Sequence, residues 1–357
     1  MTSPVQRRPR IAFLLGDVGG VGPEMGVKLL ADAAVRSAAD ILLIADPVVL
    51  AEGERVAGVK LPVQRVARAD ETLPTGTPTG TLAWLADDCL QGALPPQAQS
   101  TEASGRAALR ALELATDAVR AAQVQGIVFA PLNKHSLRLA GMTQEDELRY
   151  MQERLSVPGF VCEFNITSNL WTSRVTSHVP LRDVAPLITE PAVHAAVHII
   201  DHALRQAGVA RPRIAVTGLN PHAGDGGSIG REEIEVIEPA VQSLKAQGPD
   251  ARGPYSPDTV FIAARRGDFD AVVSMYHDQG QIAMKLMGFE RGVTLHGGLP
   301  VPVSTPASGS AFDIAGQGLA RVDGLRAALE LNLRMAGRAA QAALEVQRPS
   351  TAHGGGN

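Results

Sequence analysis

Short apolar runs alternate with longer helix-forming stretches through most of this 357-residue chain. Runs such as Ile11–Leu15, Gly126–Ala130 and Asp270–Met275 have the length and apolar character of buried strands. Stretches of helical character, including Gly105–Gln123 and Glu190–Ala207, separate such runs. This alternation predicts an α/β protein with a largely parallel sheet.

Residues 71–100 break the alternation. Their Thr-Gly-Thr-Pro-Thr-Gly and Leu-Pro-Pro-Gln sequences are typical of turns. We therefore expect an irregular segment around a short helix there.

Composition narrows the class of protein. The chain is 45% hydrophobic and 20% charged, which fits a folded protein large enough for two lobes. Its net charge of -4 gives no basic surface for nucleic acid. Cys89 and Cys162 are its only cysteines, which excludes a disulfide framework and suits a reducing compartment. No stretch reaches the ~18 apolar residues of a membrane span, so we expect a cytoplasmic protein without membrane or nucleic-acid partners.

Three histidines, His178, His222 and His277, each end or closely follow a strand-like run. In α/β proteins, ligands bind outside the carboxyl ends of the strands. Three imidazoles at that edge could bind one divalent metal and leave other positions open for substrate. A single histidine is more often a surface or satisfied core residue, and spacing alone does not decide between these interpretations.

A glycine cluster, Gly16–Glu24, follows the first strand-like run and opens a helix, which is where phosphate loops lie. The GxGxxG register fails, because the sixth position from Gly20 is Met25. Glu24 at the positive end of a helix would also repel an anion. These points favour a tight structural turn over phosphate binding.

Two polar segments follow later strands. Residues 220–233 place His222 and Asp225 in a glycine-rich loop, which favours a binding site over a flexible linker. Residues 276–280 place polar groups directly after a buried strand, which is costly unless they are used or hydrogen-bonded. Lys285, about two helical turns beyond His277, could bind a carboxylate or transfer a proton; otherwise it is a surface lysine.

Asp258 and Asp313 are further acidic candidates in small-residue or proline-containing loops. Either could instead be a helix cap.

Seven motifs occur in order along the chain. They are GDxxGxGPE at Gly16–Glu24, PLNK at Pro131–Lys134, TSHVPL at Thr176–Leu181, NPHAGD at Asn220–Asp225, PDTVF at Pro257–Phe261, YHDQG at Tyr276–Gly280 and GSAFDIAG at Gly309–Gly316. Together they resemble the 4-hydroxythreonine-4-phosphate dehydrogenase family of NAD-dependent enzymes. The resemblance spans nearly the whole chain.

The resemblance implies an isocitrate/isopropylmalate-dehydrogenase-like fold with two α/β/α lobes and an interlobe cleft. We expect residues 1–130 and 305–357 in lobe 1 and residues 131–304 in lobe 2. It further implies a homodimer with the active site at its interface. A divalent metal (Zn, Mg, Mn or Co) would be held by His178, His222 and His277, and NAD would bind without the GxGxxG fingerprint.

The chain departs from the biosynthetic members at their substrate residues. Their GHT triplet after PxNK has no histidine here, and the histidine of their HGTA motif falls on Ser308. Their lysine is Lys285, their asparagine falls on Thr294, and their arginine falls on Val303. A lost arginine–phosphate contact is worth about 1.5–3 kcal/mol. We therefore expect a substrate other than the biosynthetic phosphate ester.

The expected activity is NAD- and metal-dependent oxidation of a hydroxy acid, with decarboxylation left open. The metal would stabilise the alkoxide. Lys285 would bind a carboxylate or transfer a proton, and Asp258 would act as a base or orient a metal ligand. NAD would lie along the small-residue loop that contains Gly309, Ser310 and Asp313.

Three alternatives stay open at this point. The GSAFDIAG motif resembles members that oxidise carboxylated cis-dihydrodiols in aromatic catabolism. The missing histidine at Ser308 leaves room for a metal-dependent lyase or decarboxylase without NAD. A non-enzymatic two-lobed binding protein is the third, although no export signal is visible and titratable groups are dense at strand ends.

Overall fold

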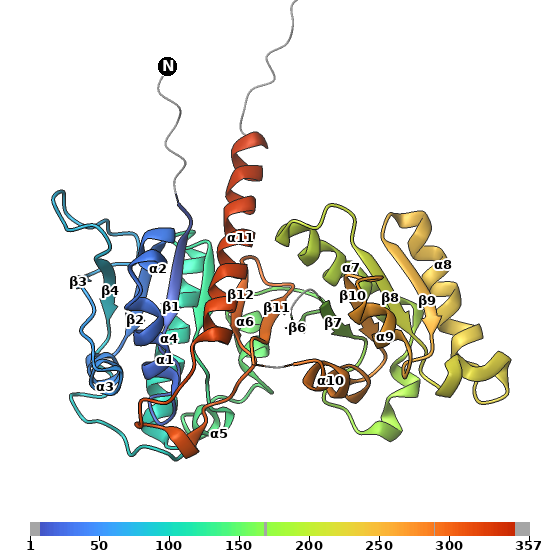
Figure 1. Ribbon diagram of the computed structural model, residues 1–357, viewed down its shortest axis with the longest axis horizontal. Helices are drawn as coiled ribbons and strands as arrows, with labels where there is room; N and C mark the ends of the chain where they lie inside the picture. The colour runs from blue at the N-terminus through green and yellow to red at the C-terminus, as the bar shows by residue number, and fades with distance from the viewer. Residues whose placement is uncertain (1–7, 168–169, 289, 347–357) are drawn as a thin grey trace, which may run out of the picture.

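A single β-sheet runs through the molecule (Figure 1). The computed structural model describes residues 8–167, 170–288 and 290–346. In these ranges the sheet has 12 strands in the order β3-β4-β2-β1-β5-β12-β11-β6-β7-β10-β8-β9. The strands are β1 (Arg10–Leu14), β2 (Asp40–Ala45), β3 (Val63–Val66), β4 (Leu82–Ala86), β5 (Gly126–Phe129), β6 (Cys162–Thr167), β7 (Leu170–Arg174), β8 (Arg213–Thr217), β9 (Asp250–Tyr255), β10 (Ala271–Ser274), β11 (Val293–Gly297) and β12 (Val303–Pro306).

Helices connect these strands and pack beside the sheet (Figure 1). The α-helices are α1 (Gly22–Leu30), α2 (Ala33–Ala38), α3 (Pro47–Ala57), α4 (Glu102–Arg120), α5 (Lys134–Leu139), α6 (Glu147–Arg154), α7 (Glu190–Ala207), α8 (Glu238–Gln247), α9 (Val260–Arg265), α10 (His277–Leu286) and α11 (Asp323–Val346). None of the helices in the described ranges combines the length and apolar character of a membrane span.

The sheet has two parallel halves joined by antiparallel strands. From β3 to β12 all neighbouring strands pair in parallel. The pairs β12-β11, β11-β6 and β6-β7 are antiparallel, and β7, β10, β8 and β9 are parallel again. The predicted α/β class is confirmed.

Separate hydrophobic clusters lie in the two halves, and α11 contributes side chains to both. Leu329 packs with the first-half cluster around Phe13, whereas Leu331 packs with the second-half cluster around Phe164. Met151 of α6 belongs to a first-half cluster, so packing of the first half continues past residue 130. The lobe boundaries given above stay a prediction.

The strongest sequence signals gave the right elements. The strand-like runs around residues 11–15, 126–130 and 270–275 are β1, β5 and β10, and the two helical stretches are α4 and α7. The short helix expected within residues 71–100 is wrong, because the apolar run there forms β4. Its backbone pairs with β2 on one side and β3 on the other, which outweighs its local helix propensity.

Candidate active site

The three motif histidines follow three neighbouring parallel strands. His178 follows β7, His277 follows β10, and His222 follows β8. These strands are adjacent in the order β7-β10-β8. Because the carboxyl ends of parallel strands meet at one edge of a sheet, all three imidazoles come from the same edge.

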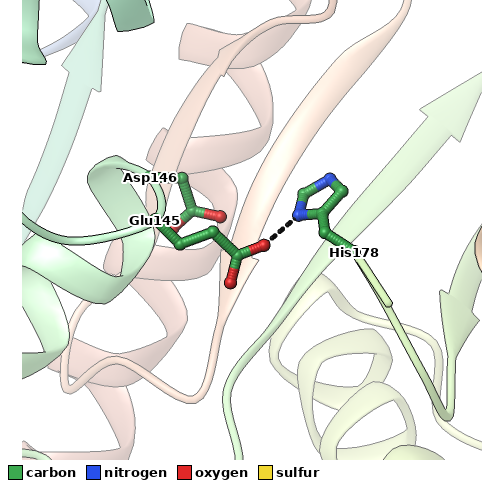
Figure 2. Close-up of side chains that lie close together, drawn as sticks. All are labelled: Glu145, Asp146 and His178. Atoms are coloured by element: carbon green, nitrogen blue, oxygen red, sulfur yellow. Dashed lines mark hydrogen bonds and ion pairs between the residues drawn. The ribbon is translucent and has the colours of Figure 1, made fainter. Parts of the chain in front are cut away.

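The side chains of His178 and His277 lie next to each other, and each imidazole forms a hydrogen bond with a carboxylate. Their ring centroids are 5.6 Å apart. Nδ1 of His277 is 2.7 Å from Oδ1 of Asp278, and Nδ1 of His178 bonds the carboxylate of Glu145 (Figure 2). A carboxylate on Nδ1 fixes the tautomer and leaves Nε2 for a metal, as is common for metal-binding histidines.

His222 lies in a tight loop after β8, at Pro221–Gly227. Its φ is 54°, in the left-handed region. Oε1 of Glu233 holds the start of this loop by accepting hydrogen bonds at 2.7 Å from the backbone N–H groups of Leu219 and Asn220. The start of the loop is therefore held against the carboxylate of Glu233.

Asp258 lies in the loop after β9, near His222. A hydrogen bond from Ser256 Oγ lowers the pKa of Asp258, and the charge of His222 contributes to the same shift. Each of the three imidazoles thus has a carboxylate nearby. Within the described residues, however, the ligand atoms of the three histidines do not all lie within 4.8 Å of one another, so His222 would have to approach the other two to share an ion.

Glu145 was not anticipated from the sequence. Glu145, Asp146 and His178 each offer a ligand atom, and these atoms lie within 4.8 Å of one another (Figure 2). Asp146 caps α6 by accepting from the backbone N–H of Arg149 at 2.9 Å, which leaves Glu145 to face His178. The acidic run at residues 145–147, where the biosynthetic members continue from their GHT triplet, was the available signal.

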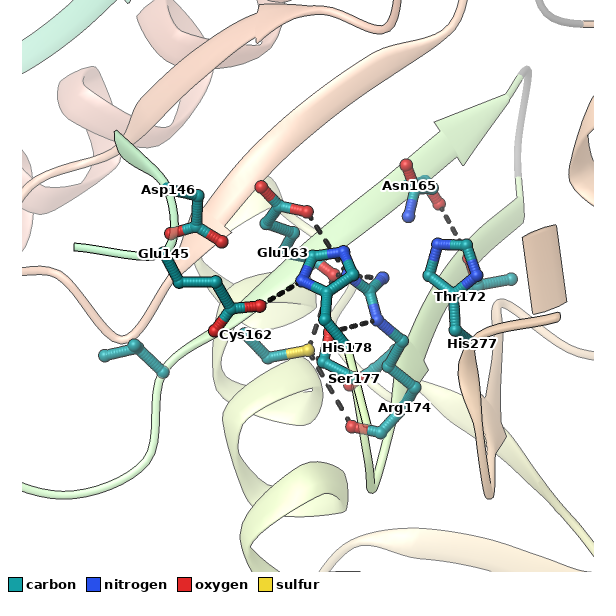
Figure 3. A network of polar contacts seen from close by, with 12 residues as sticks. Glu145, Asp146, Cys162, Glu163, Asn165, Thr172, Arg174, Ser177, His178 and His277 are labelled. Carbon is teal, nitrogen blue, oxygen red and sulfur yellow. Dashed lines mark hydrogen bonds and ion pairs between the residues drawn. The ribbon is translucent and has the colours of Figure 1, made fainter. Parts of the chain in front are cut away.

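A cavity of about 350 Å³ lies beside His178. Arg174 and Glu163 line it and form an ion pair of 3.2 Å, and Nε of Arg174 donates to Oγ of Ser177 at 2.8 Å (Figure 3). Phe160 and Val179 add apolar surface. The cavity can therefore take a small molecule that has both polar and apolar parts.

The predicted substrate residues lie in different environments. Lys285 is exposed on α10, on the same helical face as His277 and two turns away. Thr294 is half-buried on β11 opposite Asn165. Val303 is fully buried in the core of the first half. Its expected place in the substrate site is therefore not supported, because its side chain packs inside the sheet layer.

The predicted cofactor loop joins the glycine cluster in the first half. The carbonyl oxygen of Ser310 accepts from the backbone N–H of Val21 at 2.9 Å. A Cβ on Gly20 would lie 2.5 Å from that oxygen, so only glycine fits there. Gly309 and Asp313 flank this contact in the loop after β12.

The glycine cluster itself is a tight turn. Asp17 is buried, which raises its pKa, and Oδ1 of Asp17 accepts from the backbone N–H of Gly19 at 3.0 Å. Glu24 is also buried and pairs with Lys28 at 2.6 Å and with the backbone N–H of Ala320 at 2.7 Å. The carboxylate in the first turn of α1 is thus held by contacts within the fold, which favours the structural interpretation over phosphate binding.

Comparison with known proteins agrees with this description. The family profile described as pyridoxal phosphate biosynthetic protein PdxA matches residues 37–332. A Pseudomonas aeruginosa relative with the provisional name 4-hydroxythreonine-4-phosphate dehydrogenase 2 is 51% identical, over 92% of this chain and 97% of its own length. D-threonate 4-phosphate dehydrogenase of Cupriavidus necator is 37% identical, over 93% of this chain and 98% of its own.

Solved structures give the same result. 4-Hydroxythreonine-4-phosphate dehydrogenase from Klebsiella pneumoniae superposes with a TM-score of 0.80 at 31% identity, over 92% of this chain and 98% of that one. A terephthalate 1,2-cis-dihydrodiol dehydrogenase from Burkholderia xenovorans gives 0.66 at 27% identity, with the same shares of both chains. The protein therefore has the α/β architecture of these dehydrogenase structures, built on one mixed sheet. Within this class of structures, the chain belongs to the PdxA family.

Proposed function

We propose that this protein is an NAD-dependent, divalent-metal-dependent dehydrogenase that oxidises the hydroxyl group of a hydroxy acid. The observation that carries the proposal is the placement of His178, His277 and His222 after three adjacent parallel strands. Carboxylates on Nδ1 of the first two add to it. Its relatives are named dehydrogenases, which favours an enzyme over a binding protein.

The chain's own residues have distinct roles in this proposal. The three histidines would hold the metal through the ring nitrogens that face away from their carboxylates. Bound there, a divalent metal would lower the pKa of a substrate hydroxyl and stabilise the alkoxide. Lys285 would bind a substrate carboxylate or transfer a proton, and Asp258 would accept a proton or orient His222. NAD would bind along the loop of Gly309, Ser310 and Asp313, next to the glycine turn.

The substrate class follows from the changed residues. The arginine of the biosynthetic members is replaced by Val303, which is buried, and their asparagine by the neutral Thr294. A phosphate at that position would have no arginine partner, so we propose that 4-hydroxythreonine 4-phosphate is a poor substrate. D-threonate 4-phosphate, the substrate in the name of a relative, is the first compound to compare with it. Decarboxylation would follow oxidation only if the product is a β-keto acid.

A carboxylated cis-dihydrodiol is the second candidate substrate. The structural likeness to a terephthalate dihydrodiol dehydrogenase favours it. The apolar side chains of Phe160 and Val179 in the cavity beside His178 could contact a ring. A metal-dependent lyase without NAD is distinguished from both by the absence of NADH formation.

We also propose a homodimer. Leu181, which follows His178, is 70% exposed, and Leu286 at the end of α10 is 84% exposed. Two large apolar side chains exposed on segments that carry the motif histidines fit an interface at the site. Sedimentation analysis is expected to give a dimer, and dilution should lower both the dimer fraction and the activity.

The test uses His178→Ala, His222→Ala and His277→Ala. Each should lose bound metal and NADH formation with a panel that contains D-threonate 4-phosphate, 4-hydroxythreonine 4-phosphate and a carboxylated cis-dihydrodiol. His198→Ala is the control, because this exposed residue on α7 bonds Gln247 away from the site. A motif variant that keeps full metal content and turnover would remove that histidine from the proposed site.

A further inference from the structure

A second group of potential ligands lies at the centre of the sheet. Glu147 is the first residue of α6, Glu163 is on β6, and His296 is on β11. Glu163 and His296 are directly opposite each other in the antiparallel register. One ligand atom from each of the three residues lies within 4.8 Å of the others. None of them belongs to the motifs that define the first site.

Several buried polar atoms of this group have no hydrogen-bond partner among the residues that the structure describes. His296 is 2% exposed, and neither of its ring nitrogens has a partner there. The same holds for the buried Oε2 of Glu147 within the described ranges. Buried polar atoms are normally hydrogen-bonded, because leaving one unpaired costs about 1–3 kcal/mol. The ring also packs edge-on to Phe129, with centroids 5.6 Å apart, which restricts its rotation towards other partners.

Two basic residues lie near the carboxylates of the group. Lys134 acts on both Glu147 and Glu163, and Arg174 forms an ion pair with Glu163. Arg174 pairs with only one oxygen of Glu163, Oε2, so the other can bind an additional ligand. Burial raises the pKa of Glu147, whereas the charges of His296, Arg174 and Lys134 outweigh burial and lower the pKa of Glu163.

We propose that Glu147, Glu163 and His296 bind a divalent cation, as a second metal site separate from the three motif histidines. Two carboxylates and one imidazole form a mixed oxygen and nitrogen set that suits Mn²⁺ or Zn²⁺. Bonds of about 2.0–2.2 Å to a central ion would need only small rotations of these side chains. The ion would join the start of α6 to β6 and β11, next to the cavity beside His178, which Glu163 also lines.

Metal counting tests this site independently of the proposed reaction. The variant His178→Ala/His222→Ala/His277→Ala removes the first site and is dialysed to equilibrium against Mn²⁺ and, separately, Zn²⁺. We expect it to retain one equivalent of metal. Adding His296→Ala should remove that equivalent, whereas adding the control His198→Ala should not.

The outcomes separate the two sites. If wild-type protein binds metal but the triple variant retains none, the proposed second site is overturned and the first site is left intact. A triple variant that keeps its metal after His296→Ala also overturns it. Glu147→Gln, which keeps the size of the side chain, repeats the test if His296→Ala lowers the helical circular dichroism signal. Metal retained in the triple variant with normal NADH formation would instead contradict the first site.

Discussion

The ring centroid of His178 lies 5.6 Å from the ring centroid of His277, although the two residues are far apart in the chain. The contact follows from the pairing of β7 with β10, in which Arg174 is opposite Ser274 in parallel register. The two strands therefore end side by side, and the segments that carry the two histidines begin at the same edge of the sheet. A shift of this register would separate the two rings.

At the proposed metal site, replacing Glu145 should weaken metal binding because its carboxylate orients His178. Glu145 bonds Nδ1 of His178, and carboxylates in this position typically change metal affinity by about 10–100-fold when replaced. Glu145→Gln should therefore lower metal affinity by about that factor, measured by competition with a chelator. Glu102→Gln, on the exposed start of α4, is the control. Equal affinity in both variants would show that Glu145 does not orient His178.

Restoring the family's arginine at position 303 should destabilise the fold and not create a phosphate site. Val303 is 0% exposed and pairs with Ile127 in the sheet. A buried, unpaired guanidinium should cost at least about 3 kcal/mol of unfolding free energy. Urea unfolding of Val303→Arg measures this cost. Thr294→Asn, at a half-buried position, should cost less than about 1 kcal/mol. A stable Val303→Arg variant with improved turnover of the biosynthetic phosphate ester would contradict the structure.

The ion pair between Arg213 and Asp270 should make stability depend on pH. Burial opposes ionisation of Asp270, but hydrogen bonds from Arg213 outweigh it and lower the pKa of Asp270 in the folded protein. The stabilisation is therefore fully present above the unfolded-state pKa of about 3.9 and is lost as the pH falls through the folded-state value. Because both partners are partly exposed, Asp270→Asn should cost only about 1 kcal/mol at neutral pH. Urea unfolding from neutral to acidic pH should show the variant and the wild type converging at low pH. A constant difference would contradict this assignment.

Cys89 should react slowly with alkylating reagents. Burial raises the pKa of its thiol to about 12, and the nearby charges of Asp46 and Asp87 add to the shift. Since the thiolate is the reactive form, native protein at mildly alkaline pH should label with iodoacetamide much more slowly than urea-unfolded protein. Cys162→Ala removes the other thiol and isolates Cys89. Equal labelling rates in folded and unfolded protein would show that the thiol is not protected.

The sequence predicts the elements that have a strong local pattern and misses those defined by their neighbours. β1, β5 and β10 are buried apolar runs, so their strand character is visible locally. β7 contains Thr, Ser and Arg, and β11 ends in His and Gly. Both are strands because each pairs with neighbours on both sides. That pairing depends on the order of strands in the sheet, which no local pattern encodes.

In the candidate site too, the sequence identifies some residues but not the contacts between them. The motif histidines are recognisable because each follows a strand-like run, but their adjacency depends on the order β7-β10-β8. Glu145 has no motif of its own, and it reaches His178 only because the chain before α6 passes the end of β7. Val303 matches a functional position in sequence, yet the structure buries it. Contacts between distant segments are therefore the part of the site that the sequence could not provide.

The position of α11 limits how the two halves can move. Leu329 and Leu331 lie two residues apart on this helix and are buried in opposite clusters, and the amide of Asn332 donates to the carbonyl oxygens of Ile127 and Pro302 at 2.9 Å. A large rigid-body rotation of one half relative to the other would have to break apolar contacts that α11 makes with both halves. Local changes of shape around the candidate site should therefore be confined to the loops at the strand ends, where α11 makes none of these contacts.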